Sequence, residues 1–158
     1  MAHISVTALD EESLLRDRIA PEDFIDCFTV QAVLGPREAA RVITDFPGWA
    51  RWLLLVRRLV TAPFGLSQDG PEATDKIGPF PVEAETAKEL VAGFDDKHLD
   101  FRVSVRSEAG EVSLATWVRP HNIGGRLYLW LILPFHVAIA KDALRRVAAS
   151  APHREIGS

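Results

Sequence analysis

The sequence predicts a single α+β domain in which a curved antiparallel sheet carries two short helices and one long C-terminal helix packed across it. Residues 90–116 alternate between apolar and polar side chains, which is the period of strands that bury one face. Residues 126–149 have the apolar spacing of a long helix. The chain has 158 residues, 47% of them hydrophobic and 25% charged, which is enough for one core.

The domain boundaries are expected at the ends of this patterned region. Residues 1–21 are polar and end in Pro21, so we interpret them as a loosely held N-terminal arm. The single domain then spans residues 22–149, and residues 150–158 form a C-terminal tail. Proline and glycine residues separate elements inside the domain and do not form a linker.

The first half of the domain is predicted to contain a strand and a bent pair of helices. A strand is expected from Asp23 to Val30. Gly35-Pro36 then begins a short helix, because proline is favoured in a first helical turn. Phe46-Pro47-Gly48 interrupts it, and a second helix follows from Trp49 to about Val60. Loop residues rich in proline and glycine follow at positions 62–76.

A meander of antiparallel strands comes next, preceded by a strand near Phe80 to Thr86 whose register the sequence leaves open. A four-residue turn is expected to pair Phe94 with Leu99, and a second such turn to pair Val105 with Val112. Both pairings put the apolar side chains on one face. These are Leu90, Ala92, Phe94, Leu99, Phe101, Val103 and Val105.

The last helix is predicted from Arg126 to about Ala149, with a kink near Pro134. Its second half is amphipathic, and His136 lies on the apolar side, so we expect the imidazole to point toward the sheet. The first half has no polar face, which means that something must cover it. The bent helix pair, a second subunit and a membrane surface are the alternatives.

Charge and composition argue against several classes of protein. The formal net charge of -4 is unsuited to a nucleic-acid groove, which needs clustered Lys and Arg. The apolar stretch from Leu127 to Ala140 is shorter than the ~20 residues of a membrane span and contains Pro134 and His136, so no integral membrane segment is expected. Residues 1–10 lack a signal-peptide pattern, and Cys27 is the single cysteine. We therefore expect a soluble cytoplasmic protein.

No catalytic, metal-binding or nucleotide-binding motif is recognisable. There is no G-x-S-x-G elbow, and the five histidines are dispersed without H-x-x-x-H or C-x-x-C spacing. Gly124-Gly125 lacks the further glycines and the βαβ setting of a nucleotide loop. We expect no metal and no cofactor, and the sequence favours a non-catalytic role.

Acid–base chemistry in an apolar cavity remains open, because burial there shifts proton affinity toward neutrality. His136 is the candidate catalytic residue, with Glu83 and Glu85 as candidate partners. The alternative is a structural histidine held by a backbone carbonyl.

Several local runs carry a resemblance to a known family. They are Trp49–Leu66 (WARWLLLVRRLVTAPFGL), Ile77-Gly78-Pro79-Phe80, His98-Leu99-Asp100-Phe101-Arg102, and Gly125-Arg126-Leu127-Tyr128 leading to Pro134-Phe135-His136. Over about residues 22–149 the chain resembles an uncharacterised bacterial family, a domain of unknown function. With the order of elements, it also resembles the helix-grip (SRPBCC) superfamily of START domains, polyketide cyclases and the birch pollen allergen. The resemblance implies an apolar ligand between sheet and terminal helix, and no catalytic residues.

The leading hypothesis is a binder of a hydrophobic small molecule, such as a lipid, quinone or polyketide, in a cavity between the sheet and the C-terminal helix. The residues expected to line it are Phe94, Phe101, Leu114, Leu129, Leu133 and His136. One alternative is a cyclase, dehydratase or isomerase that uses His136 as general acid or base. The other is a homodimeric interaction module without ligand, joined through the start of the C-terminal helix.

Overall fold

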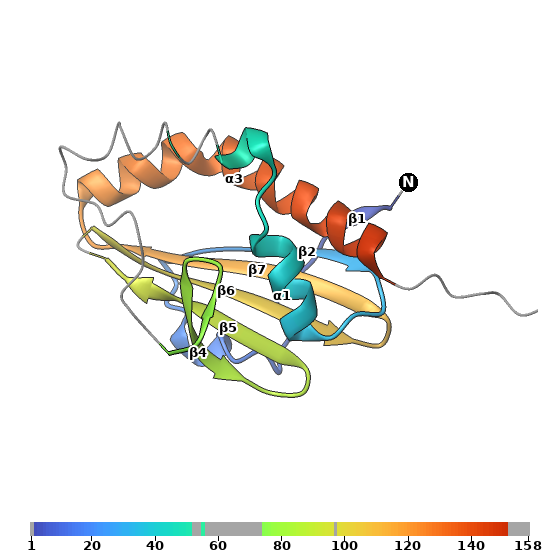
Figure 1. Ribbon diagram of the computed structural model, residues 1–158. Helices are drawn as coiled ribbons and strands as arrows, with labels where there is room; N and C mark the ends of the chain where they lie inside the picture. The colour runs from blue at the N-terminus through green and yellow to red at the C-terminus, as the bar shows by residue number, and fades with distance from the viewer. Residues whose placement is uncertain (1, 52–54, 56–73, 97, 152–158) are drawn as a thin grey trace, which may run out of the picture.

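A sheet of seven antiparallel strands forms the centre of the molecule, and the predicted α+β architecture is confirmed (Figure 1). The computed structural model describes residues 2–51, 55, 74–96 and 98–151. The strand order is β1-β2-β7-β6-β5-β4-β3. The strands are β1 (Ile4–Val6), β2 (Phe24–Gln31), β3 (Lys76–Ile77), β4 (Phe80–Glu85), β5 (Glu89–Asp95), β6 (Leu99–Glu108) and β7 (Glu111–Pro120).

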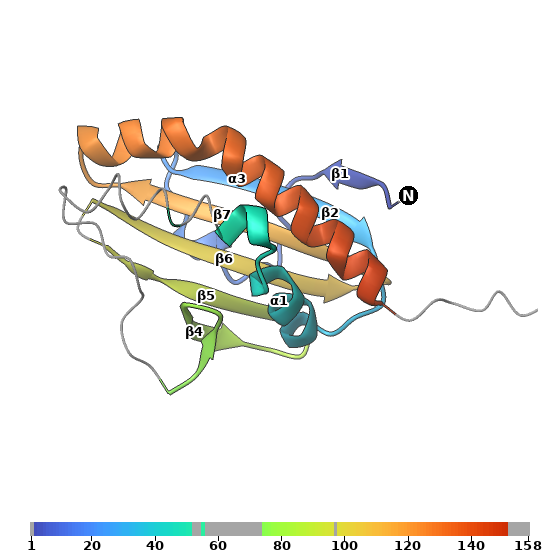
Figure 2. The same ribbon diagram turned by 45° about the horizontal axis from the view of Figure 1, so that its top comes forward.

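Two helices cover one face of this sheet, which we call the inner face. Figure 2 shows α3 (Ile123–Ser150) above β2 and β7, with α1 (Pro36–Thr44) beside it on the side of β5 and β6. Arg146 of α3 joins the two helices, because its guanidinium donates to the carbonyls of Val42 and Asp45, each at 2.6 Å. These carbonyls belong to the last turn of α1 and its cap, where a cation is favoured.

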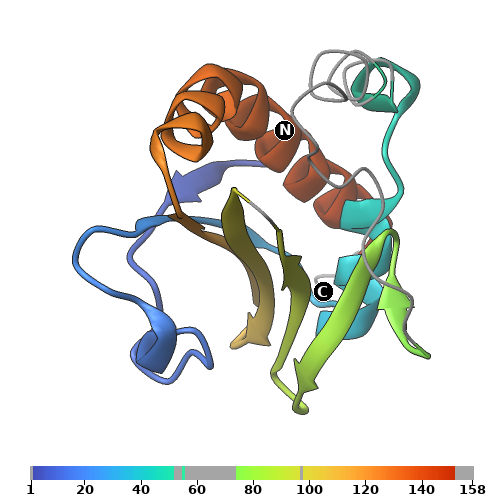
Figure 3. The same ribbon diagram turned by 90° about the vertical axis from the view of Figure 1, so that its left-hand side faces the viewer.

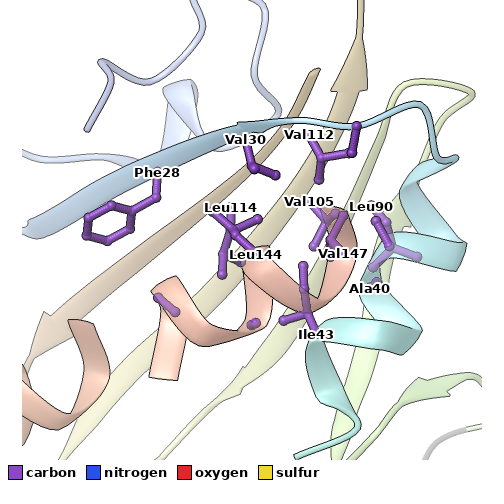
Figure 4. Close-up of a cluster of buried hydrophobic side chains, with 14 of the residues drawn as sticks. Phe28, Val30, Ala40, Ile43, Leu90, Val105, Val112, Leu114, Leu144 and Val147 are labelled. Atoms are coloured by element: carbon purple, nitrogen blue, oxygen red, sulfur yellow. The ribbon is translucent and has the colours of Figure 1, made fainter. Parts of the chain in front are cut away.

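The closed part of the core lies between the second half of α3, α1 and the neighbouring strands. Every second side chain of the strands points toward the helices, and the helix side chains that meet them recur every three or four residues (Figure 4). Leu144 and Val147 of α3 and Leu90 of β5 are completely buried there. The other labelled members are Phe28, Val30, Ala40, Ile43, Val105, Val112 and Leu114.

The hairpin register differs by two residues from the prediction. Phe94 pairs with Phe101 and not with Leu99, and the second hairpin is shifted in the same way. In the second hairpin the turn is tighter than predicted: Ala109 and Gly110 alone form it, with φ of 53° and 77°. Left-handed residues in a two-residue turn match the twist of the strands. A shift of two keeps every side chain on its predicted face.

The helix boundaries follow local signals. Pro36 lies in the first turn of α1, as predicted. Residues 48–51 are helical, whereas most of the predicted helix from Trp49 to Val60 and of the loop at 62–76 lies outside the described residues. α3 begins three residues earlier than predicted, because the Asn122 side chain accepts a hydrogen bond from the Gly125 N–H at 2.9 Å and caps it. Pro134 lies inside α3.

The N-terminal segment packs against the outer face of the sheet, where the sequence predicted a loosely held arm. β1 pairs with β2, and a 3-10 turn (Arg16–Arg18) lies on the side of the sheet away from α3 (Figure 3). Leu15 is completely buried against Trp117 and Cys27. Isolated leucine and isoleucine residues in a polar stretch thus supply the apolar contacts of a third layer.

A buried carboxylate fastens this segment. Glu89 of β5 is 1% exposed and accepts hydrogen bonds from the Ser13 hydroxyl at 2.6 Å and the Leu14 N–H at 2.8 Å. The Ser104 hydroxyl donates at 2.7 Å, and the Arg106 guanidinium lies 3.8 Å away. A carboxylate with this many donors can be buried in the charged form.

Candidate functional site

α3 is tightly packed against the sheet at both ends, whereas its inward side chains between them are only half-buried. At its start, Gly125 is buried against the β5–β6 turn, and a Cβ on it would lie 2.2 Å from the His98 carbonyl oxygen. From Ala140 onward, the inward side chains are buried. Between these points Leu129, Leu133 and His136 have the same helical spacing toward the sheet but are only half-buried. Part of the surface of these three side chains is therefore accessible to solvent.

One polar pair lies at this surface. His136 Nε2 lies 2.9 Å from Asp26 Oδ2, and the two side chains are 22% and 17% exposed. The alternation of β2 puts Asp26 on the inner face, opposite Thr116 of β7. Phe24, on the same face, meets the imidazole edge-on with 6.3 Å between ring centroids. The carboxylate thus fixes the orientation of the histidine ring, as acids do in many catalytic pairs.

The second oxygen of Asp26 lacks a hydrogen-bond donor among the described residues. Asp26 Oδ1 is buried and has no hydrogen-bond partner in the part of the chain that the structure describes. An ionised carboxylate oxygen can only accept hydrogen bonds, and a buried acceptor without a donor costs about 1 to 3 kcal/mol. A molecule that brought a donor to this oxygen would remove that cost.

An aromatic cluster lies on the same inner face as the pair, two strands away. Phe101 packs edge-on against Phe94 and Phe80, with centroid distances of 4.7 and 5.4 Å. One row of the sheet register runs from Phe94 through Phe101 and Val118 to Phe24. Because adjacent strands are about 4.8 Å apart, the cluster lies on the order of 10 Å from Phe24. All three cluster phenylalanines are half-buried, so part of each ring is accessible.

The six residues predicted to line a cavity divide into two groups. Leu114 is 4% exposed and belongs to the closed core. The other five are half-buried. They are Phe94, Phe101, Leu129, Leu133 and His136.

Glu83 and Glu85 do not pair with His136, which corrects the prediction. Glu83 forms ion pairs with Arg18 and Arg102, and Glu85 binds Arg37 of α1. A register shift between Val82 and Ala84 explains why two alternate positions point to different faces. The partner of His136 is also not a backbone carbonyl.

Asp26 is the site residue that the sequence reading missed. The signal was present, because alternation from Phe24 puts Asp26 on the same face as Phe28 and Val30. An acid at a core-facing position needs a partner. Among the described residues, no group of three or more His, Cys, Asp or Glu side chains could hold a metal ion.

The outward side of the first half of α3 is apolar and exposed. Its exposed large side chains are Ile123 (76%), Leu127 (59%), Trp130 (73%), Leu131 (63%) and Phe135 (51%). By length and composition alone, α3 could cross a membrane: an 18-residue window has a mean hydropathy of 1.5, and 11% of it is buried. The expectation of no membrane segment stays a prediction.

Comparison with known proteins gives the family of the chain. A family model described as a protein of unknown function, DUF2867, matches residues 19–143. Searches of curated proteins and of solved structures found no match. The matched region contains β2 to β7 and most of α3, and with them both Asp26 and His136. The chain therefore belongs to the DUF2867 family.

Proposed function

We propose that this protein binds an apolar small molecule, such as a lipid, quinone or polyketide, between the inner face of the sheet and α3. The observation that carries the proposal is the burial pattern of α3. Gly125 is buried, as are the inward side chains from Ala140 onward, whereas Leu129, Leu133 and His136 retain accessible surface. A site bounded at both ends by packed contacts and walled by apolar side chains is typical of small-molecule sites.

The architecture supports the same proposal. A long C-terminal helix lying along an antiparallel sheet, after a strand and short helices, is the arrangement that suggested the helix-grip group. We propose a structural relationship to that SRPBCC superfamily, in which a ligand is gripped between sheet and helix. The phenylalanine cluster would supply the apolar wall, and the Asp26–His136 pair the polar group that orients the ligand.

Ligand-induced thermal stabilisation tests the proposal with a matched pair of variants. Leu129→Trp adds an indole on the inward side of α3, whereas Leu127→Trp adds the same group on the outward side, where Leu127 is 59% exposed. A ligand at about 100 times its Kd stabilises the fold by about 2.7 kcal/mol. For a chain of this size that raises the Tm by roughly 5 to 10 °C.

We expect members of a panel of lipids, quinones and aromatic polyketides to raise the Tm of the wild type and of Leu127→Trp. They should leave Leu129→Trp unchanged, because the indole fills the site. If no member of a broad panel moves the wild-type Tm, the binding proposal fails.

The Asp26–His136 pair also favours the enzyme alternative. An imidazole oriented by a carboxylate beside an accessible apolar surface could act as general acid or base in a cyclase, dehydratase or isomerase. Such chemistry first requires a molecule bound beside the pair. The binding experiment therefore comes before any assay of turnover.

A second candidate function is self-association through the start of the C-terminal helix. It is favoured by the exposed apolar outward side of α3, since contiguous apolar surface of this kind marks interaction sites. This reading does not need a ligand.

A further inference from the structure

We infer that the ligand of the proposed site carries a neutral hydrogen-bond donor, such as a hydroxyl group, which binds Asp26 Oδ1, and that carboxylate ligands are rejected. The inference rests on the proposed function and goes beyond it by naming the head group. It comes from two neighbouring features, the buried acceptor Asp26 Oδ1 and the apolar side chains around it, such as Phe24.

The hydrogen-bond capacities of the pair decide the head group. His136 Nε2 and Asp26 Oδ2 face each other at 2.9 Å, so the donor of that imidazole nitrogen is already used. Asp26 Oδ1 remains as a buried acceptor without a partner among the described residues. A hydroxyl group donates to such an oxygen, whereas a ligand carboxylate has only acceptors to offer.

Charge points in the same direction. A ligand carboxylate beside Asp26 would put two negative charges within a few ångströms in a partly buried setting, where their repulsion is poorly screened. Lys141, five residues beyond His136 on α3, is the cation to consider as a counter-charge. Its ammonium lies over the ring of Phe28, 5.9 Å from the centroid, and so has an interaction of its own.

The surroundings of the pair otherwise offer apolar contact. Phe24 meets the imidazole, and the register row through Phe24 continues with Val118 and Phe101. A ligand with its hydroxyl at Asp26 would therefore extend its apolar body toward the phenylalanine cluster. Flat or chain-like molecules with one terminal hydroxyl have this distribution of polarity.

Two matched ligand pairs test the inference: dodecan-1-ol against dodecanoate, and 2-naphthol against 2-naphthoate. Their affinities for the full-length chain are measured by isothermal titration calorimetry. We expect the wild type to bind the hydroxyl member of at least one pair about tenfold or more tightly than the carboxylate. Asp26→Asn should reduce this preference to less than about threefold, because the negative charge is gone.

Asp100→Asn is the matched control. Asp100 also pairs with a histidine, since His121 Nε2 lies 2.9 Å from Asp100 Oδ1, but it lies opposite Arg119 on the outer face. This variant should keep the wild-type preference. Circular dichroism and Tm check that each variant is folded. If Asp26→Asn does not fold, the affinities of the wild type for the hydroxyl and carboxylate ligands still test the inference.

The outcomes separate the two proposals. Equal affinities, a tighter carboxylate, or a preference that survives in Asp26→Asn would overturn the head-group inference and leave the apolar site standing. If the wild type binds the carboxylate more tightly and Lys141→Met loses this preference, the head group binds Lys141 and not Asp26. If neither member of either pair binds, the site itself is rejected together with the inference.

Discussion

Asp23 holds one corner of the outer face through a set of hydrogen bonds that favour its charged form. Its carboxylate is 4% exposed and accepts from the Trp117 indole at 2.8 Å and the Arg119 guanidinium at 2.9 Å. The N–H of Ala20 donates at 2.8 Å. Burial acts to raise the pKa of Asp23, but the hydrogen bonds from Arg119, Ala20 and Trp117 outweigh it, and the pKa is lowered.

Asp23→Asn should lower the free energy of unfolding by about 2 to 3 kcal/mol at pH 7, since hydrogen bonds to a charged group are lost. Because the pKa is lowered in the folded chain, the stabilisation is complete above the ordinary value of 3.8 and is lost as the pH falls through the folded-state value. Urea titrations at pH 7 and at pH 2 to 3 should therefore show the gap between wild type and variant closing in acid.

Asp45→Asn is the control for this prediction. Asp45 is 79% exposed and lies 3.4 Å from Arg51, so its ion pair should contribute less than about 1 kcal/mol. A gap between wild type and Asp23→Asn that stays constant with pH would contradict the role given to the carboxylate.

Single residues of the site were only partly predictable from the sequence. Helical spacing was enough to orient His136 toward the sheet, because a helix face depends on local periodicity. Its partner Asp26 is 110 positions away and meets it only through the packing of α3 on β2. The faces of Glu83 and Glu85 stayed open, and both were candidate partners of His136, because a register shift inside a strand has no clear signature in the sequence.

At the scale of elements, α3 changes character along its length. Its outward side carries large apolar groups in the first half, such as Leu131, and charged groups in the second half, such as Arg145. This change was readable from the sequence because it depends on helical spacing alone. The hairpin register was not, because it depends on the length of each turn. In the second hairpin, Ala109 and Gly110 adopt positive φ and form a two-residue turn where four residues were expected.

Self-association through this outward side predicts a response to one added charge. Leu131→Glu should shift the mass measured by light scattering from dimer to monomer, because a carboxylate would be buried in the interface. Ala149→Glu adds the same charge on the same side of α3, five turns further on, where the helix is already polar. It should leave the mass unchanged. A wild type that is monomeric at all concentrations would remove this candidate function.

At the scale of the whole molecule, the sheet is packed on both faces. The helices cover the inner face, and the N-terminal segment lies on the outer face (Figure 3). Leu15 of this segment packs in one buried cluster with Cys27 and Trp117. Two-sided burial explains why β2 has apolar side chains at adjacent positions, such as Cys27 and Phe28, that point to opposite faces. The sequence predicted a covered inner face only. The N-terminal segment is polar with scattered leucines, and it has no apolar periodicity that would indicate packing on the outer face.

Adjacent leucines provide a test of this third layer. Leu15 is 0% exposed and Leu14 is 43% exposed. Leu15→Ala should lower the free energy of unfolding by about 2 to 4 kcal/mol, because it leaves a cavity over the sheet. Leu14→Ala should cost less than about 1 kcal/mol, since its backbone bond to Glu89 is kept. Equal effects of the two substitutions in urea unfolding would contradict the packing described.

Because the sheet is covered on both faces, the segment needed for folding is longer than the segment that matches the family model. The family match ends at residue 143 and starts at residue 19, so it omits Leu15 on one face and Leu144 and Val147 on the other. A fragment trimmed to the match would expose apolar strand surface on both sides at once. Recombinant versions of this protein should therefore keep at least residues 4–151 for crystallisation or screening.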